Sequence, residues 1–140
     1  MSGHDFADSK VIADIINGSK VIAVVGLSDK PDRPSFGVAS YLQAQGYKII
    51  PVNPAKSEIL GEKCYPDLKS IPGKIDVVDV FRRSDAVGPI ADEAIEVKAK
   101  AIWFQEGVIN LEAAEKASKA GLQVVMDRCM LKEHRKLQSG

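Results

Sequence analysis

The stretch VIAVVGLSDKPDRPSFG, residues 21–37, decides the fold class. It opens with five apolar residues, Val21 to Val25, four of them valine or isoleucine. An unbroken run of this kind is typical of a strand covered on both faces of a sheet. Gly26 ends the run, and a helix is expected to begin near Ser35. A buried strand, a glycine turn and a helix in this order form the repeating unit of a parallel α/β sheet.

Four more apolar runs of similar length follow along the chain: Ile49 to Val52, Val77 to Phe81, Ala101 to Phe104 and Leu122 to Met126. The alternation of strands and helices predicts an α/β fold, a Rossmann-like doubly wound five-stranded parallel sheet with helices on both faces. Right-handed crossovers that run outward from the first strand predict the strand order 3-2-1-4-5. The irregular stretch 55–73 is expected to be a loop with a short helix at residues 67–70.

Local signals bound several of the predicted helices. Asn110 is placed to cap a helix that spans residues 111–120. Gly46 and Gly121 each follow a helical stretch and precede a strand, where a left-handed residue closes the helix. Further helices are expected at residues 9–16 and 131–137, before the first strand and after the last.

Length and composition limit the possible classes of protein. The chain has 140 residues, which suits a single domain spanning residues 1–140, with residues 1–8 expected to be a flexible tail. Its 19 basic and 19 acidic residues cancel, so we expect no nucleic acid and no membrane as partner. The chain start has no signal-like apolar core, and two cysteines are too few for a disulfide framework. These features predict a cytoplasmic protein.

Polar residues follow each of the apolar runs. In an open parallel sheet the ligand binds at the carboxyl ends of the strands, near the point where the strand order reverses. The side chains that follow the runs are therefore expected to meet at one edge of the sheet. They are Leu27, Ser28, Asn53, Pro54, Lys56, Arg82, Arg83, Gln105, Glu106, Asp127, Arg128 and Cys129.

The loop after the first strand has features of a phosphate site. Gly26 lets the backbone approach a phosphate closely, and the following amides and the Ser28 hydroxyl can donate to it. Arg33 offers a bidentate clamp, and the helix that starts near Ser35 would direct its positive end to the same place. The alternative is a plain strand-to-helix turn with a solvated Arg33. We favour the phosphate site because three anion-binding features converge there.

The loop differs from the common nucleotide-binding motifs. A G-x-G-x-x-G fingerprint would need glycines where Ser28 and Pro31 stand, and the chain has no G-x-x-x-x-G-K-[ST] loop. The second strand ends in Asn53, where a nicotinamide site usually has an acid for the ribose hydroxyls. Both NAD binding and ATP hydrolysis are therefore disfavoured.

Five segments in order carry a family resemblance: VVGLS (24–28), PVNP (51–54), DVVDVF (76–81), WFQEG (103–107) and DRCM (127–130), with Pro31, Arg33 and Ser35. With these, the sequence resembles the small CoA-binding proteins related to the amino-terminal domain of the succinyl-CoA synthetase alpha subunit. The resemblance spans residues 20–134. It implies a Rossmann-like domain that binds coenzyme A or an acyl-CoA as a carrier, sensor or accessory subunit, without a reaction of its own. A protein partner or a homodimer is possible.

The resemblance also implies roles for individual residues. Residues 26–29 correspond to the segment that holds the CoA phosphates, Lys56 to a basic residue at the nucleotide end, and residues 104–106 to the turn along the pantetheine. The synthetase's phosphorylated histidine belongs to a second domain, and neither His4 nor His134 matches it. No catalytic residue and no metal ligand is expected. The CoA-binding candidates are Gly26, Leu27, Ser28, Asp29, Arg33, Ser35, Asn53, Pro54, Lys56, Phe81, Arg82, Phe104, Gln105 and Glu106.

Two other functions stay open. One is an acyl-CoA transferase or hydrolase that uses Cys129 or Glu106, although no base is evident beside Cys129, which is better explained as a small buried residue. The other is a regulatory domain that responds to NAD or another nucleotide. Asp79 interrupts an apolar strand, so it is expected to contact the ligand or to hold Arg82 or Arg128. Asp127 is expected to cap or pair at the site rather than serve as an acid or base.

Overall fold

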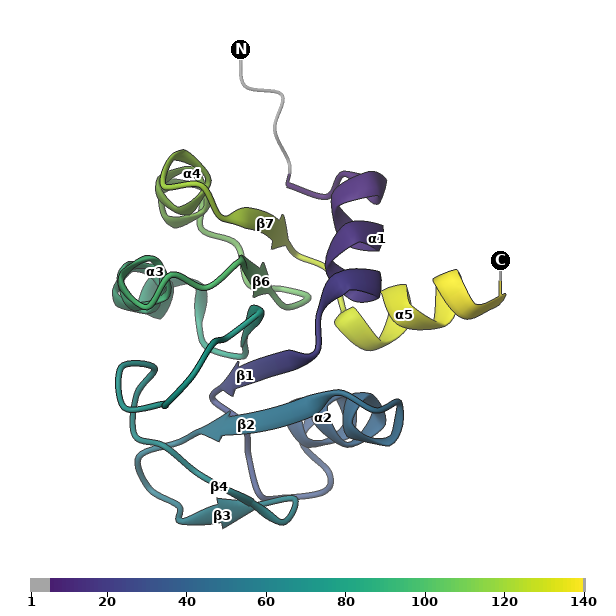
Figure 1. The fold of residues 1–140 in the computed structure, drawn as a ribbon, viewed down its shortest axis with the longest axis vertical. Helices are drawn as coiled ribbons and strands as arrows, with labels where there is room; N and C mark the ends of the chain where they lie inside the picture. The colour runs from purple at the N-terminus through teal and green to yellow at the C-terminus, as the bar shows by residue number, and fades with distance from the viewer. Residues whose placement is uncertain (1–5, 140) are drawn as a thin grey trace.

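The computed structural model of the protein describes residues 6–139, and its centre is a five-stranded parallel sheet (Figure 1). The sheet strands are β1 (Val21–Val25), β2 (Lys48–Val52), β5 (Val77–Val80), β6 (Ala101–Phe104) and β7 (Gln123–Met126). The helices are α1 (Ser9–Gly18), α2 (Pro34–Ala44), α3 (Val87–Glu96), α4 (Leu111–Lys119) and α5 (Met130–Ser139), with a 3-10 turn, η1 (Ser84–Ala86), before α3. The fold class predicted from the sequence is confirmed.

The strand order differs from the prediction. The structure has the order β2-β1-β5-β6-β7, which is 2-1-3-4-5 when only the sheet strands are numbered, not 3-2-1-4-5. After β2 the chain crosses the face opposite to α2, where Leu68, Ile71 and Ile75 pack. Because each crossover is right-handed, a connection over the opposite face moves in the opposite direction across the sheet. The third strand therefore pairs with the free side of β1, and the order reverses between β1 and β5.

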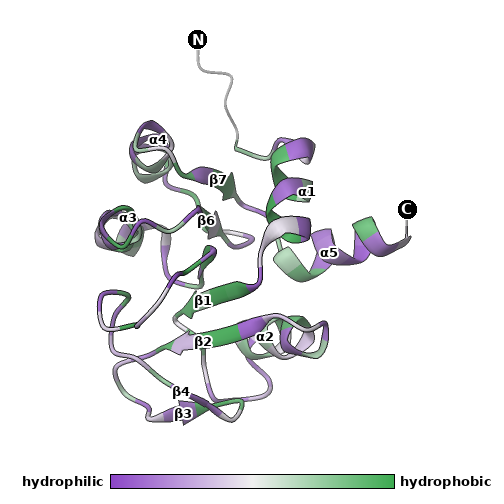
Figure 2. Ribbon diagram, in the orientation of Figure 1, coloured by the Kyte–Doolittle hydropathy of each residue, from purple (hydrophilic) through white to green (hydrophobic). Residues whose placement is uncertain are grey.

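Helices and the 53–76 connection cover the two faces of the sheet. One face packs against α3, α4 and residues 68–75, and the other packs against α1, α2 and α5. In Figure 1, α3 and α4 lie together on one side of the strands, and α1, α2 and α5 lie on the other. Figure 2 shows the inner strands largely hydrophobic, whereas the helices alternate between hydrophobic and hydrophilic positions. This distribution is what a sheet buried on both faces requires.

The predicted helix signals are present, but residues 6–8, expected to belong to a flexible tail, pack with the domain, and residues 1–5 of that predicted tail lie outside the described residues. Asn110 Oδ1 accepts a hydrogen bond from Ala113 N at the start of α4, and Gly46 and Gly121 have φ angles of +102° and +100°. Residues 6–8 are part of the fold. Phe6 is buried and its carbonyl oxygen accepts a hydrogen bond from Met126 N at 2.8 Å, while Asp8 caps α1. The aromatic side chain fills the edge of the core beside β7.

The predicted short helix at residues 67–70 is absent. Asp67 Oδ1 instead accepts from Ser70 N at 2.9 Å, which forms a turn. The 55–73 stretch also contains a small antiparallel hairpin, β3 (Glu58–Ile59) and β4 (Glu62–Lys63), beside β2. Asp67 and Ser70 bond to each other's backbone, and such local bonds compete with helix formation.

Asp76 fastens β5 to β1. Its Oδ2 accepts hydrogen bonds from Lys20 N at 2.8 Å and Val21 N at 2.9 Å, and Lys100 Nζ lies 3.6 Å from Oδ1. Partial burial alone would raise the pKa of this carboxyl, but the two backbone bonds and Lys100 hold it below its ordinary value. Asp76 thus joins the two strands between which the sheet order reverses.

We expect Asp76→Ala to lower the free energy of unfolding by about 1–3 kcal/mol, because the amides of Lys20 and Val21 lose a charged acceptor. The folded-state pKa lies below the unfolded one, so this contribution is present above the unfolded pKa of about 3.9 and is lost as the pH falls through the folded value. Urea denaturation at pH 7 and pH 3 measures both effects. Asp85→Ala is the control, because Asp85 pairs with Arg83 at the exposed surface and should change stability by less than about 0.5 kcal/mol. Equal losses in the two variants would contradict the role of Asp76.

Candidate functional site

The main cavity of the described residues lies where the strand order reverses. The chain leaves β1 for α2 on one face of the sheet and leaves the adjacent β5 for α3 on the other face. The diverging loops bound a cavity of about 620 Å³, which the ends of β6 and β7 close. This volume is within the range of small-molecule sites, and a cavity at a topological switch point is the usual ligand site of an open α/β sheet.

The structure brings eight of the fourteen candidate residues into this cavity, which we call the switch-point cavity: Gly26, Ser28, Arg33, Ser35, Phe81, Arg82, Gln105 and Glu106. Six others are absent from its lining: Leu27, Asp29, Asn53, Pro54, Lys56 and Phe104. Pro54 lines a separate cavity of about 190 Å³. Phe104 is fully buried on the α3 and α4 face and does not line the switch-point cavity.

Position 26 requires glycine, because the backbone there lies against the end of β5. Its φ angle is +86°, a conformation that side-chain-bearing residues rarely adopt. A Cβ atom at this position would lie 2.3 Å from the carbonyl oxygen of Phe81. Gly26 therefore allows the end of β1 to lie directly against the end of β5, at the floor of the cavity.

The loop after Gly26 is held by serine hydroxyls. Ser35 Oγ accepts a hydrogen bond from Ser28 N at 3.0 Å, and Ser28 Oγ accepts one from Lys30 N at 3.0 Å. The Ser28 amide, which we expected to donate to a phosphate, is therefore already used within the loop. The Ser28 hydroxyl keeps its proton available for a ligand, because it acts only as an acceptor here.

Asn53 and Leu27 form a structural tie between the first two loops. Asn53 Nδ2 donates to Leu27 O at 3.0 Å, and its Oδ1 accepts from Ala55 N at 2.8 Å. A carboxylate could not make the first of these bonds, because it has no hydrogen to donate. This explains why the second strand ends in an amide where a nicotinamide site usually has an acid.

The cations near the cavity differ in their pairing. Lys56 Nζ lies 3.1 Å from Asp29 Oδ2, and Arg83 Nε lies 3.3 Å from Asp85 Oδ1. Within residues 6–139, the guanidinium groups of Arg33 and Arg82 make no ion pair and no hydrogen bond. These two groups line the cavity from opposite loops, so the charge available to a ligand is positive.

The ends of β6 and β7 form the remaining wall. Gln105 Oε1 accepts from Met130 N at 3.2 Å, and both oxygens of Glu106 lie 3.1 Å from Lys132 Nζ. The bond to Glu106 raises the pKa of Lys132. Asp127 Oδ1 accepts from Gly107 N at 2.7 Å, so Asp127 holds the turn beside Glu106, which agrees with the capping role predicted for it. Cys129 is buried in the same wall.

Asp79 lies beneath the floor of the cavity and contacts neither predicted partner. It is fully buried between Val24 and Trp103, and neither of its oxygens has a hydrogen-bond partner among the described residues. Burial raises the pKa of this carboxyl well above its ordinary value, because the buried site disfavours the charged form. Arg128, one of the predicted partners, donates instead to the carbonyl of Asp127.

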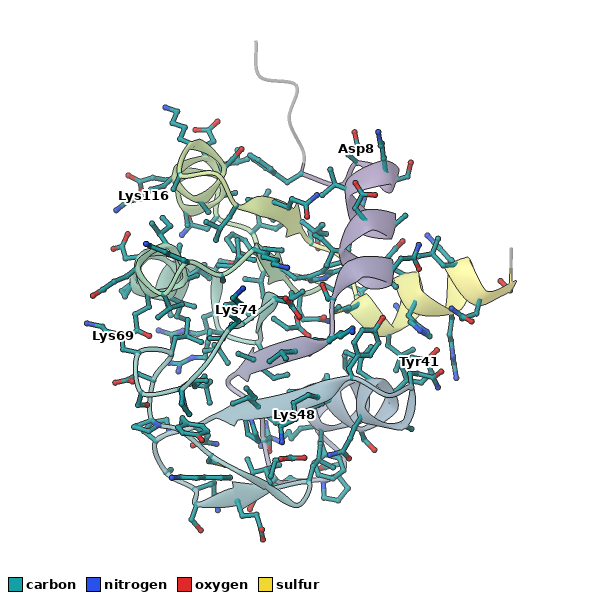
Figure 3. The ribbon with its side chains drawn as sticks, in the orientation of Figure 1. Asp8, Tyr41, Lys48, Lys69, Lys74 and Lys116 are labelled. Carbon is teal, nitrogen blue, oxygen red and sulfur yellow. The ribbon has the colours of Figure 1, made fainter. Side chains whose placement is uncertain are left out.

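His134 belongs to the core rather than to the cavity. The side chain is buried, and its Nδ1 lies 2.8 Å from the hydroxyl of Tyr41. Figure 3 shows Tyr41 where α2 approaches α5. The rings of Tyr41 and Tyr47 both meet the imidazole edge-on, at centroid distances of 5.4 and 6.0 Å. These contacts attach α5 to the domain. His4, the other histidine, lies outside the described residues.

Sequence reasoning missed part of the cavity wall. Pro34, Val38 and Val108 line it, whereas Cys129, which also lines it, was expected at this edge of the sheet. Val38 is one helical turn beyond Pro34, so a reading of the first turns of α2 could have found it. Val108 follows the Gly107 turn, whose φ angle is +87°, and the sequence carries no signal for the direction of that turn. Together these residues add an apolar stretch to a cationic cavity.

The part of the chain that the structure describes holds no candidate metal site and no candidate membrane-spanning helix. No group of three or more histidine, cysteine or acidic side chains between residues 6 and 139 could hold a metal ion. No helix in the same range is long and apolar enough to cross a membrane.

The chain is similar to known proteins over most of its length. A family model described as "CoA binding domain" matches residues 20–135. The Bacillus subtilis protein YneT, described as uncharacterized, is 47% identical over 123 residues, which cover 88% of this chain and 91% of YneT. The solved structure of a hypothetical protein from Pyrococcus horikoshii has a TM-score of 0.90 and 44% identity, with coverage of 94% of this chain and 92% of that one.

A more distant relative is a subunit of a larger enzyme. The alpha subunit of the ADP-forming acetate–CoA ligase II of Pyrococcus furiosus is 29% identical over 120 residues. The match covers 78% of this chain but only 26% of that subunit. The chain therefore spans about a quarter of the length of this relative.

Proposed function

The chain belongs to the CoA-binding domain family, and from this premise we propose that it binds coenzyme A, free or acylated, in the switch-point cavity. The observation that carries the proposal is the pair of unpaired guanidinium groups, Arg33 and Arg82, on the two loops that diverge at the cavity. CoA joins a diphosphate and a 3′-phosphate to a long, largely neutral pantetheine arm. It therefore suits a site that combines free cations with an apolar wall.

The two parts of the ligand suit two parts of the cavity. Arginine forks match phosphate oxygens bidentately, and the Ser28 hydroxyl adds a neutral donor beside Arg33. Val38, Phe81 and Val108 offer apolar surface on which the pantetheine arm can lie. Gln105, whose oxygen is engaged by Met130 N, keeps its amide hydrogens for the polar groups of that arm.

We propose a non-catalytic role, as a carrier, sensor or accessory subunit. Glu106 is paired with Lys132, and no histidine among the described residues lines the cavity next to Cys129. The Pyrococcus furiosus relative is a subunit of a ligase, which supports a protein partner that supplies the chemistry. As part of the same proposal, the protein acts in the cytoplasm.

Calorimetric titration of the purified protein with CoA, acetyl-CoA, dephospho-CoA and NAD tests the proposal. We expect CoA to bind with micromolar affinity and NAD to bind far more weakly, because Asn53 offers no acid to the ribose hydroxyls. Binding of NAD without binding of CoA would refute the proposal in favour of a nucleotide-responsive regulatory domain. Hydrolysis or transfer of acyl-CoA that disappears in Cys129→Ala or Glu106→Gln would establish an enzyme instead.

A further inference from the structure

Arg82 differs from the other cationic residues near the site because it borders two cavities. It lines both the switch-point cavity and the neighbouring cavity of about 190 Å³, so its side chain lies at their junction. The stem of the side chain rests on the end of β1, because a Cβ atom at Gly26 would lie 2.9 Å from Arg82 Cδ. The absence of a side chain at Gly26 thus makes room for Arg82 at the point where β1 and β5 meet.

The neighbouring cations are less available than Arg82. Lys56, the basic residue that corresponds to the family position for the nucleotide end, is paired with Asp29 at 3.1 Å and does not line the cavity. Two positions expected to face the ligand therefore neutralise each other. The Arg82 guanidinium has no acidic partner within the described part of the chain. Its charge is therefore available to an anionic ligand.

Arg33 complements Arg82 from the other side of the switch point. Arg33 precedes α2 on one face of the sheet, and Arg82 follows β5, whose connection runs to the other face. An anion in the cavity between the two loops would have one arginine on each of them. A diphosphate has two adjacent charged groups and fits two opposed forks better than a single phosphate does.

We infer that Arg82, together with Arg33, recognises the diphosphate of the bound ligand, and that Lys56 does not supply this contact. This inference rests on the proposed binding of CoA and specifies which cationic side chains bind the diphosphate. The family resemblance implies only that residues 26–29 hold the phosphates and that Lys56 meets the nucleotide end, and it assigns no role to Arg82.

The test compares Arg82→Met, Arg82→Lys and Lys56→Met with the parent protein. Methionine keeps an apolar stem against Gly26 while it removes the charge, and lysine keeps the charge without the fork. Each protein is titrated with CoA, with dephospho-CoA, which keeps the diphosphate but lacks the 3′-phosphate, and with pantetheine, which has no phosphate. Urea denaturation of each variant checks that the fold is intact.

We expect Arg82→Met to weaken CoA and dephospho-CoA alike by about 10- to 100-fold and to leave the affinity for pantetheine unchanged. Arg82→Lys should recover part of the loss, and Lys56→Met should change each affinity by less than about threefold. A loss with CoA but not with dephospho-CoA would assign Arg82 to the 3′-phosphate and overturn the inference. A larger loss in Lys56→Met than in Arg82→Met would also overturn it. Absence of CoA binding in the parent protein would instead refute the proposed function.

Discussion

Gly26→Ala is expected to lower the free energy of unfolding by about 2–5 kcal/mol, the largest loss we expect from a single methyl group in this chain. Two effects add. The alanine must adopt a φ angle near +86°, and its Cβ would lie 2.3 Å from the Phe81 carbonyl oxygen, a backbone atom that cannot turn aside. The ends of β1 and β5 must separate to admit it. Because these ends form the floor of the switch-point cavity, ligand binding should be lost with the stability.

Two other glycines of the chain separate these effects. Gly46 has a φ angle of +102° with open space around its Cβ position, so Gly46→Ala reports the conformational cost alone, about 1 kcal/mol. Gly37 lies within α2 with ordinary φ and open space, so Gly37→Ala should be neutral or stabilise by up to about 1 kcal/mol. Urea denaturation midpoints of the three variants provide the comparison. A Gly26→Ala protein no less stable than Gly46→Ala would show that the close approach of β1 and β5 is unimportant.

Asp79→Leu is expected to stabilise the protein, by about 1–3 kcal/mol at low pH and by more at neutral pH. The Asp79 carboxyl is fully buried and lacks a hydrogen-bond partner among the described residues, so the fold bears its full desolvation cost. Leucine has the same branching at Cγ and suits the surrounding Val24 and Trp103. The methyl groups of leucine are larger than the carboxyl oxygens, so the gain in stability is smaller if the side chains around position 79 cannot shift to admit them.

The pH dependence of stability identifies the contribution of the charge. Burial raises the folded-state pKa of Asp79 above the unfolded value, so the folded protein retains a proton that the unfolded chain releases. The pH-dependent part of the destabilisation by Asp79 is absent below the unfolded pKa of about 3.9 and grows by about 1.4 kcal/mol per pH unit up to the folded pKa. Asp79→Asn removes this slope and keeps the polar burial. Parallel stability–pH curves for the parent and Asp79→Asn would show that the carboxyl does not titrate in this way.

The sequence predicted most of the local structure, because apolar runs and capping residues act over short distances. The five sheet strands, the Asn110 cap and the left-handed Gly46 and Gly121 all lie where their residues indicated. The same reasoning located the loop after Gly26 at the cavity. It could not show that Phe104 is absent from the cavity lining, because the alternation of side chains along a strand shows which residues share a face but not which face borders the cavity.

The sequence by itself determined the class of fold, the edge of the sheet at which a ligand can bind, and the supply of cations there. Only the tertiary structure decided the strand order and the pairing of those cations. The 53–76 connection has no helical stripe, so the face that it covers, and with it the position of β5, depends on how Leu68 and Ile75 pack against distant strands. The pairing of Lys56 with Asp29 and the freedom of Arg82 follow from that arrangement, because an ion pair depends on distances in space that the order of residues does not contain.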